Sequence, residues 1–188
     1  MKGTRTEKNL LATFAGESQA RMRYTYFAKV ARKEGYNQLE AVFLETADNE
    51  KEHAKRFFKF LEGGMVEIQA TYPAGVIGTT AENLAASAAG ENEEHTKLYP
   101  EAAEIAAEEG FPKVADAFRY IAKVEERHEA RYRYYLEQLK NGTFHKRTAP
   151  TRWKCANCGY VAEGPEAPEV CPACLHPKAY FEEYYVKY

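Results

Sequence analysis

Two Glu-x-x-His motifs restrict what this chain can fold into more than any other feature. Each motif is preceded by a further glutamate, at almost the same distance upstream in the two cases. The repeated sets are Glu17, Glu50 and His53, and then, one helical hairpin later, Glu91, Glu125 and His128. Residues three apart share one face of a helix. A duplicated helical hairpin with inward-facing glutamates and histidines is how a four-helix bundle holds two metal ions in its core.

The apolar spacing predicts four long helices, at residues 6–34, 37–62, 79–110 and 112–140. Gly35, the pair Gly63-Gly64 and Pro112 are typical of helix ends and starts. The connections are short, long and short, with residues 65–78 forming the long one. This order predicts a mainly α fold, a ferritin-like four-helix bundle with a long crossover between its second and third helices. The expected domains are the bundle at 1–142, a linker at 143–152 and a small Cys-rich unit at 153–188.

The glutamates of both motifs fall on the apolar stripes of these helices. In the third helix the expected stripe runs through Glu91, Glu94, Leu98 and Ile105. Burying unpaired carboxylates costs several kcal/mol, and two cations in the layer would relieve that cost. The alternative is that the glutamates lie on a solvated face. Oxygen-rich ligation with one imidazole per metal favours iron or manganese over a closed zinc site.

Charge and composition exclude several partners. The net charge of −2 gives no reason to expect nucleic acid. The apolar runs are all shorter than the roughly 18 residues that would predict a membrane span. The N-terminus lacks the apolar core of a secretory signal. All four cysteines fall in two Cys-x-x-Cys pairs, which indicates metal binding in a reducing compartment, and we expect the cytoplasm.

The two cysteine pairs lie in the C-terminal unit. Twelve residues separate the pair Cys155 and Cys158 from the pair Cys171 and Cys174. Four thiolates at this spacing can close a tetrahedral metal site. From spacing alone, a structural zinc ribbon and an iron site both remain open.

The residues around the cysteines carry a family resemblance. Cys155-Ala-Asn-Cys158-Gly-Tyr and Cys171-Pro-Ala-Cys174 resemble a rubredoxin iron site of the FeCys4 type, although Leu175 stands where a glycine is common. A ferritin-like bundle followed by a rubredoxin-like β/loop domain resembles the rubrerythrin family along essentially the whole chain. The resemblance implies a di-iron centre with seven ligands: Glu17, Glu50, His53, Glu91, Glu94, Glu125 and His128.

The resemblance also implies roles for individual residues. Glu94 and His53 would exchange as ligands to one iron as the oxidation state changes, so these two are the predicted catalytic residues. Tyr24 and Tyr99 match family tyrosines near the carboxylates. For both tyrosines, plain core packing and a position supporting the ligands remain open.

The implied function is a peroxidase that reduces hydrogen peroxide to water in oxidative-stress defence. We expect three iron ions per chain, two in the bundle and one on the four cysteines, with zinc able to occupy either site in isolated protein. A head-to-tail homodimer is implied as well. Because the chain has no Gly-x-Gly-x-x-Gly fingerprint, an external electron donor or reductase must supply electrons. The alternatives are a ferroxidase that handles iron and a non-enzymatic redox sensor.

Overall fold

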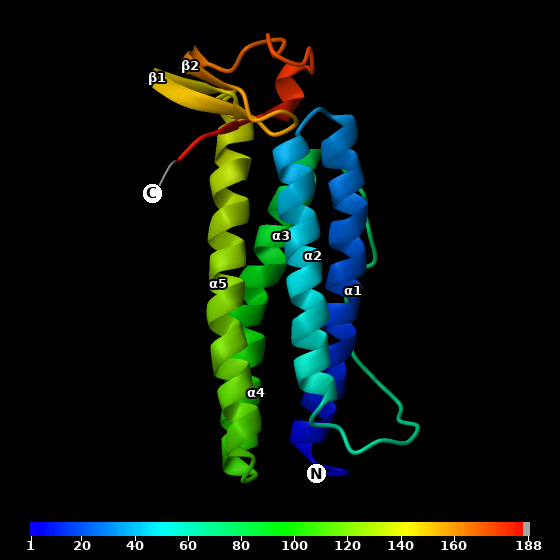
Figure 1. Cartoon of the computed structure of the whole chain (residues 1–188). Helices are drawn as coiled ribbons and strands as arrows, with labels where there is room; N and C mark the ends of the chain where they lie inside the picture. Colours follow the sequence, from blue (N-terminus) through cyan, green and yellow to red (C-terminus); the bar gives the residue numbers. More distant parts are fainter. Residues whose placement is uncertain (186–188) are drawn as a thin grey trace.

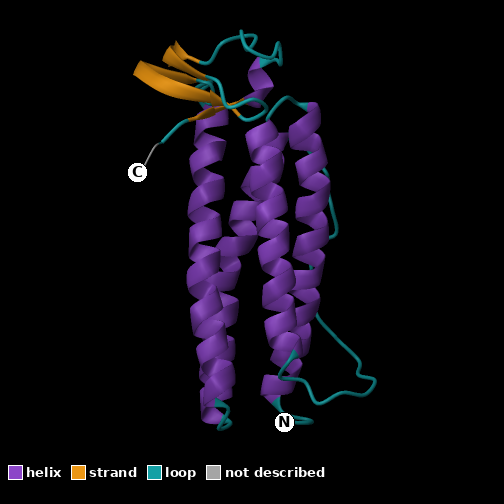
Figure 2. Ribbon diagram, in the orientation of Figure 1, coloured by secondary structure: helices purple, strands orange, loops and turns teal. Residues whose placement is uncertain are grey.

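A bundle of long helices forms most of the protein (Figures 1 and 2). The computed structural model describes residues 1–185, so the last three residues of the predicted C-terminal unit lie outside the described part. The helices are α1 (Arg5–Lys33), α2 (Asn37–Phe58), α3 (Thr80–Glu93), α4 (Tyr99–Glu108) and α5 (Pro112–Lys140). Helix α1 packs along α2, and α5 packs along α3 and α4. The predicted mainly α bundle with a long crossover is confirmed.

Several helix ends use the signals that the sequence predicts. Thr79 and Glu82 form a capping box at the start of α3, each side chain bonding to the backbone of the other. Pro112 is the first residue of α5, where its missing N–H costs nothing. Gly35 follows α1 with a φ of +83°, a conformation that glycine adopts without strain. These signals fix both short connections of the bundle.

The second helix ends four residues earlier than predicted. Helix α2 stops at Phe58, and the glycines at 63 and 64 lie in the crossover instead of capping the helix. After Phe58 the backbone tightens, since the N–H groups of Phe60 and Leu61 bond to carbonyls three residues back. Phe60 and Leu61 then pack against the lower hydrophobic cluster. Tertiary packing of these two side chains therefore ends the helix before the glycine signal.

The third predicted helix is interrupted. A π-helical turn, η1 (Glu94–Leu98), separates α3 from α4. A π turn adds one residue to an α-helix and so rotates everything beyond it. As a result Tyr99 is buried, whereas Leu98 is 44% exposed, and our prediction that Leu98 lies on the buried stripe is wrong. Ile105 is only half-buried, and Ala106 lies in the core in its place.

Two hydrophobic clusters fill the bundle, one toward each end. The upper cluster includes Phe27, Phe43 and Tyr132, and the lower one includes Phe57 and Phe118. Each long helix passes from one cluster to the other, and its metal-ligating candidates lie between the two. The apolar clusters thus enclose a polar layer in the middle of the bundle.

The C-terminal unit is a small antiparallel sheet at one end of the bundle (Figure 1). Its strands are β1 (Lys146–Cys155), β2 (Val161–Glu166) and β3 (Phe181–Glu183), in the order β2-β1-β3, with a short 3-10 turn η2 (Lys178–Tyr180) before β3. Strand β1 begins at Lys146 and therefore includes most of the segment that we predicted as a linker. Arg32 of α1 donates a hydrogen bond to the Tyr180 hydroxyl at 3.2 Å and so attaches the unit to the bundle. Within residues 1–185, none of the helices has the length and apolar character that crossing a membrane requires.

Candidate metal centres

The polar layer draws its side chains from all four long helical segments of the bundle. Glu17 comes from α1, Glu50 and His53 from α2, Glu91 from α3, and Glu125 and His128 from α5. The four glutamates are at most 1% exposed and His128 is 4% exposed. The alternative in which these glutamates face solvent is therefore wrong.

These side chains form two groups whose ligand atoms lie within 4.8 Å of one another. One group is Glu17, Glu50, His53 and Glu125; the other is Glu50, Glu91, Glu125 and His128. Glu50 and Glu125 belong to both groups. Each group then adds one more carboxylate and one imidazole, so the layer offers two equivalent sets of ligands joined by two shared carboxylates.

The hydrogen bonding of the layer shows that these residues fit metal ions. Within the described residues, five buried atoms of the layer form no hydrogen bond: Oε1 of Glu50, Oε2 of Glu91, both carboxylate oxygens of Glu125, and Nδ1 of His128. A buried polar atom without a partner costs about 1–3 kcal/mol, and more when it is charged. Such atoms in one layer require an explanation. Metal coordination would use them all, and the carboxylate–imidazole set of the layer suits iron.

The electrostatics of the metal-free layer lead to the same conclusion. Burial, with the nearby charges of Glu125 and Glu50, raises the pKa of Glu17 well above its usual value. Burial likewise raises the pKa of Glu91 to about 8. Burial opposes a charge on His128, but its contacts with Glu125, at 2.8 Å, and with Glu50 outweigh this and raise its pKa to about 12. Without cations the layer therefore holds extra protons, which metal ions would displace.

Two buried tyrosines orient carboxylates of the layer. The Tyr24 hydroxyl donates to Oε1 of Glu91 at 2.5 Å, and the Tyr99 hydroxyl donates to Oε1 of Glu17 at 2.6 Å. Burial raises the pKa of both tyrosines well above the usual value, so both remain donors. Of the two readings that the sequence left open, the structure favours a position that supports the ligands.

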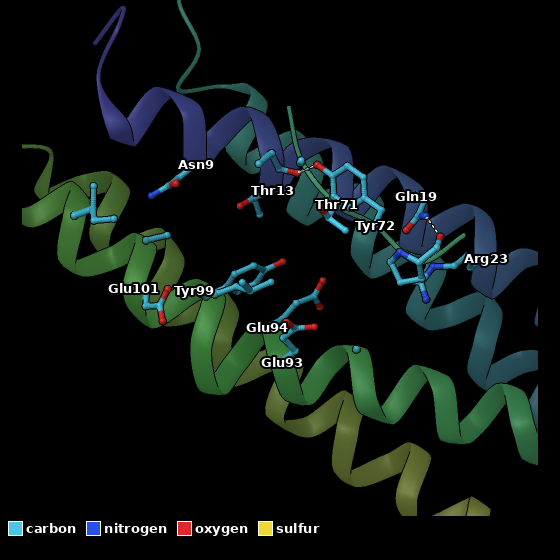
Figure 3. A pocket seen from close by; sticks show the side chains of 18 residues that line it. Asn9, Thr13, Gln19, Arg23, Thr71, Tyr72, Glu93, Glu94, Tyr99 and Glu101 are labelled. Atoms are coloured by element: carbon cyan, nitrogen blue, oxygen red, sulfur yellow. Dashed lines mark hydrogen bonds between the residues drawn. The ribbon is translucent and has the colours of Figure 1, made fainter. Parts of the chain in front are cut away.

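Glu94 lies beside the layer and outside both groups of ligand atoms. It is the first residue of the π turn η1, and its side chain lines a cavity together with Tyr99 (Figure 3). The imidazole of His53 occupies the layer, with Nδ1 2.8 Å from Oε2 of Glu50 and 2.9 Å from Oε1 of Glu125. The structure thus has His53 in the ligand layer and Glu94 out of it.

The four cysteines come together in the C-terminal unit. The Sγ atoms of Cys155 and Cys174 are 3.7 Å apart, as are those of Cys158 and Cys171, and all four ligand atoms form one group. All four cysteines, each within the described residues, are free of disulfides. The backbone N–H of His176 lowers the pKa of Cys174 to about 6, which favours the thiolate that a metal requires.

The numeral in the FeCys4 site type counts these four cysteine ligands and does not refer to residue 4. Residue 4 is a threonine, Thr4, at the opposite end of the chain from the cysteines. Its side chain caps the start of α1 by accepting a hydrogen bond from the backbone N–H of Glu7. Thr4 therefore has a structural role in the bundle and no part in metal binding.

The two cysteine loops are equivalent even where their sequences differ. Gly159 follows the first pair with a φ of +80°, and Leu175 follows the second pair with a φ of +60°. The N–H groups of both residues bond to the carbonyl of the first cysteine in their own loop. Leu175 therefore adopts the left-handed conformation expected of the glycine that it replaces.

Sequence reasoning missed the cavity beside Glu94. Arg23, Tyr72 and Ala12 line it, from α1 and from the crossover. Their positions depend on how the crossover folds over α1, and no periodic or spacing signal in the sequence indicates that arrangement.

Comparisons with known proteins agree with this architecture. The family model described as Rubrerythrin matches residues 8–136, and the model described as Rubrerythrin, rubredoxin-like domain matches residues 153–182. A rubrerythrin from Porphyromonas gingivalis is 63% identical over 182 residues, which is 97% of this chain and 91% of that protein.

Solved structures show the same fold. A mixed-valence state of nigerythrin aligns with a TM-score of 0.65 and 31% identity, over 98% of this chain and 91% of that chain. A bacterioferritin from Mycobacterium tuberculosis aligns with a TM-score of 0.65 over 76% of this chain and 91% of its own. At 20% identity the latter shows the fold alone, and that fold is ferritin-like.

Proposed function

Because this chain belongs to the rubrerythrin family, we propose that it is a non-haem di-iron peroxidase that reduces hydrogen peroxide to water. Family membership implies iron-based redox chemistry, and the peroxide substrate is our proposal. The observation that carries it is the sharing of Glu50 and Glu125 between two ligand groups, in a chain that also has a four-cysteine site. Shared carboxylates hold two metal ions side by side, typically about 3.5–4 Å apart.

The proposed complement is three iron ions per chain. Glu50 and Glu125 would bridge two of them, with Glu17 and His53 on one side and Glu91 and His128 on the other. The third would be held by the four cysteines, and zinc can replace iron in isolated protein. When bound, the iron pair supplies the two electrons that cleavage of one O–O bond consumes.

We assign the ligand exchange to Glu94 and His53. A neutral imidazole suits a ferrous ion, and an anionic carboxylate suits the harder ferric ion. Glu94 borders a cavity and therefore has room to move toward the layer that His53 now occupies. Tyr24 and Tyr99 keep the remaining carboxylates in place during this exchange. The apolar clusters above and below the layer exclude bulk water.

The position of the four-cysteine site supports electron transfer between two chains. The C-terminal unit contacts the C-terminal end of α1 through Arg32, whereas Glu17 lies in the middle of that helix. Between these two positions the helix rises by roughly 20–25 Å, a long path for electron tunnelling within one chain. We therefore propose a head-to-tail homodimer in which each C-terminal unit serves the partner's bundle. An external donor would reduce the cysteine-bound iron, and the reduced thiols fit the cytoplasm.

A rapid-mixing absorbance experiment tests the function. Anaerobically reduced, iron-loaded protein is mixed with one equivalent of hydrogen peroxide, and the thiolate-to-iron band of the C-terminal unit is followed. We expect fast oxidation, with the band appearing as peroxide disappears. Slow oxidation by peroxide, together with fast oxidation by oxygen and accumulation of iron, would instead identify a ferroxidase. A single slow turnover would identify a sensor.

A further inference from the structure

A cavity of about 440 Å³ lies between α1, the crossover and the π turn (Figure 3). Residues 70–73 of the crossover cover it. Two hydrogen bonds of 2.5 Å hold this cover on α1, from the Tyr72 hydroxyl to the Ala12 carbonyl and from the Gln19 amide to the Pro73 carbonyl. Glu94 and Tyr99 form the part of its wall that adjoins the metal layer. A molecule in the cavity therefore approaches the metal centre past these two side chains.

The cavity is much larger than hydrogen peroxide needs. One water molecule takes up about 30 Å³ of liquid, and hydrogen peroxide has only one more heavy atom. A cavity of about 150 Å³ is enough to bind benzene in a protein core. The volume of 440 Å³ falls in the range of about 300–1,000 Å³ that is typical of sites for organic ligands.

The wall of the cavity suits a molecule with an apolar body. Ala12, Ala102 and Ile105 line one part of it, and charged side chains lie toward its ends, with Glu101 at one end and Arg23 at the other (Figure 3). Apolar lining with few polar groups is the usual composition of small-molecule sites. An apolar group can thus lie against α1 and α4 while a polar group reaches Glu94 and Tyr99.

A glycine inside α3 keeps part of the wall open. Gly90 precedes the ligand candidate Glu91, and a Cβ atom added there would meet no atom of the described residues within 4 Å. Glycine in a helix interior costs about 1 kcal/mol relative to alanine. Close packing does not require a glycine at this position, so its effect here is to leave space in the cavity.

We propose that the cavity admits small organic hydroperoxides and that the di-iron site reduces them to the alcohol and water. The inference rests on the proposed peroxidase function and extends its substrate class. The O–O bond of ROOH breaks with two electrons and two protons, giving ROH and H₂O. The electrons come from the same reduced iron pair as for hydrogen peroxide, and the protons come from solvent. The R group occupies the apolar part of the cavity.

The first test compares two peroxides on three proteins. Iron-loaded wild type, Ala12→Leu and Ala107→Leu are assayed with cumene hydroperoxide and with hydrogen peroxide. Leu at position 12 fills part of the cavity without weakening α1, since leucine is a good helix former. Ala107 lies exposed on α4, away from the cavity lining, and serves as the matched control.

We expect wild type to reduce cumene hydroperoxide. Ala12→Leu should lower kcat/KM for cumene hydroperoxide relative to hydrogen peroxide by about tenfold or more, the effect of a methylene-sized change in an apolar pocket. Ala107→Leu should change neither value. An equal loss for both peroxides in Ala12→Leu, or no reduction of cumene hydroperoxide by wild type, would overturn the proposal.

The second test measures binding without turnover. Cumyl alcohol, the product from cumene hydroperoxide, is titrated calorimetrically into the oxidised, iron-loaded proteins. We expect one saturable site per chain in wild type and Ala107→Leu, with at least tenfold weaker binding to Ala12→Leu. Absence of binding to wild type would contradict the inference even if hydrogen peroxide is reduced. Binding without reduction of either peroxide would leave the cavity assignment standing and contradict the proposed function.

Discussion

The hydroxyl of Tyr99 donates a hydrogen bond of 2.6 Å to Oε1 of Glu17, on the other side of the bundle. Tyr24 repeats this contact on Glu91, at 2.5 Å. The two contacts relate the halves of the bundle, except that Tyr24 follows Glu17 by seven residues and Tyr99 follows Glu91 by eight. The π turn at residues 94–98 accounts for the extra residue. It lets both tyrosines face the layer despite the different spacing.

Replacing Tyr99 by phenylalanine should weaken metal binding. The change leaves Oε1 of Glu17 without its hydrogen-bond donor in a fully buried position. Residues that orient metal ligands typically affect affinity by about 10–100-fold. We therefore expect iron loss to a competing chelator to become at least about tenfold faster. Tyr120→Phe, at an exposed position on α5, is the control, and equal iron loss from both variants would contradict the supporting role.

Deleting Lys97 should convert the interrupted helix into a continuous one. The deletion places Tyr99 seven residues after Glu91, the spacing that Tyr24 has from Glu17. An α-helix then suffices to point the tyrosine inward. We expect a folded bundle whose crystal structure has no π turn and a displaced Glu94.

The control for this deletion is removal of Ala86 from the uninterrupted helix α3. That change rotates the ligand Glu91 away from the layer, and we expect it to lower the thermal midpoint strongly and to prevent iron binding. If deleting Lys97 damages the fold as much as deleting Ala86, the π turn is required for packing and is not merely an inserted residue.

The sequence predicted the metal layer well because its residues are constrained twice, by helical spacing and by internal repetition. Glu50 and Glu125 were expected inside, and both are buried and shared by two ligand groups. Leu98 was placed wrongly because a π turn changes the helical period without any glycine or proline to mark it. The end of α2 depends on where Phe60 packs, which is a property of the folded bundle.

Glu94→Ala should slow peroxide turnover while most of the iron stays bound. The two ligand groups are complete without Glu94, so its loss removes no ligand from the layer as it stands in the structure. The variant cannot supply a carboxylate to replace His53 when the iron is oxidised. We expect kcat for hydrogen peroxide to fall by about 10²-fold or more, in the range of a lost catalytic group. Iron content, measured by atomic emission, is the parallel readout, and unchanged turnover would eliminate the proposed exchange.

Removing the metal from the four cysteines should unfold the C-terminal unit and spare the bundle. Among the described residues, five buried side chains form the hydrophobic core of the unit, too few to be stable without a metal or other cross-link. Trp153 is the only tryptophan of the chain and is fully buried in this core. A red shift of its fluorescence on chelation should therefore report unfolding, while the helical circular dichroism remains. A shift of helix signal and fluorescence together would show that the two parts unfold as one.

His145 should make the stability of the C-terminal unit depend on pH. Burial, assisted by the charge of Lys178, lowers the pKa of His145 to about 4 from its usual 6.5. The ring lies between Phe144 and Trp153, and within residues 1–185 its Nε2 has no hydrogen-bond partner. Other charged groups near it are Arg147 and Glu169.

The sign follows from the two pKa values. As pH falls below about 6.5 the unfolded chain takes up the proton first, so the free energy of unfolding decreases until the pH reaches about 4. The full shift corresponds to about 3 kcal/mol, which partial exposure of the ring reduces to about 1–2 kcal/mol. Denaturant unfolding followed by Trp153 fluorescence at pH 7 and at pH 4 measures it. His145→Phe cannot titrate, so its free energy of unfolding should fall by about 1–2 kcal/mol less than that of wild type over this range. Metal loss from the cysteines affects both proteins equally, so parallel pH curves for the two would show that His145 is not the group responsible.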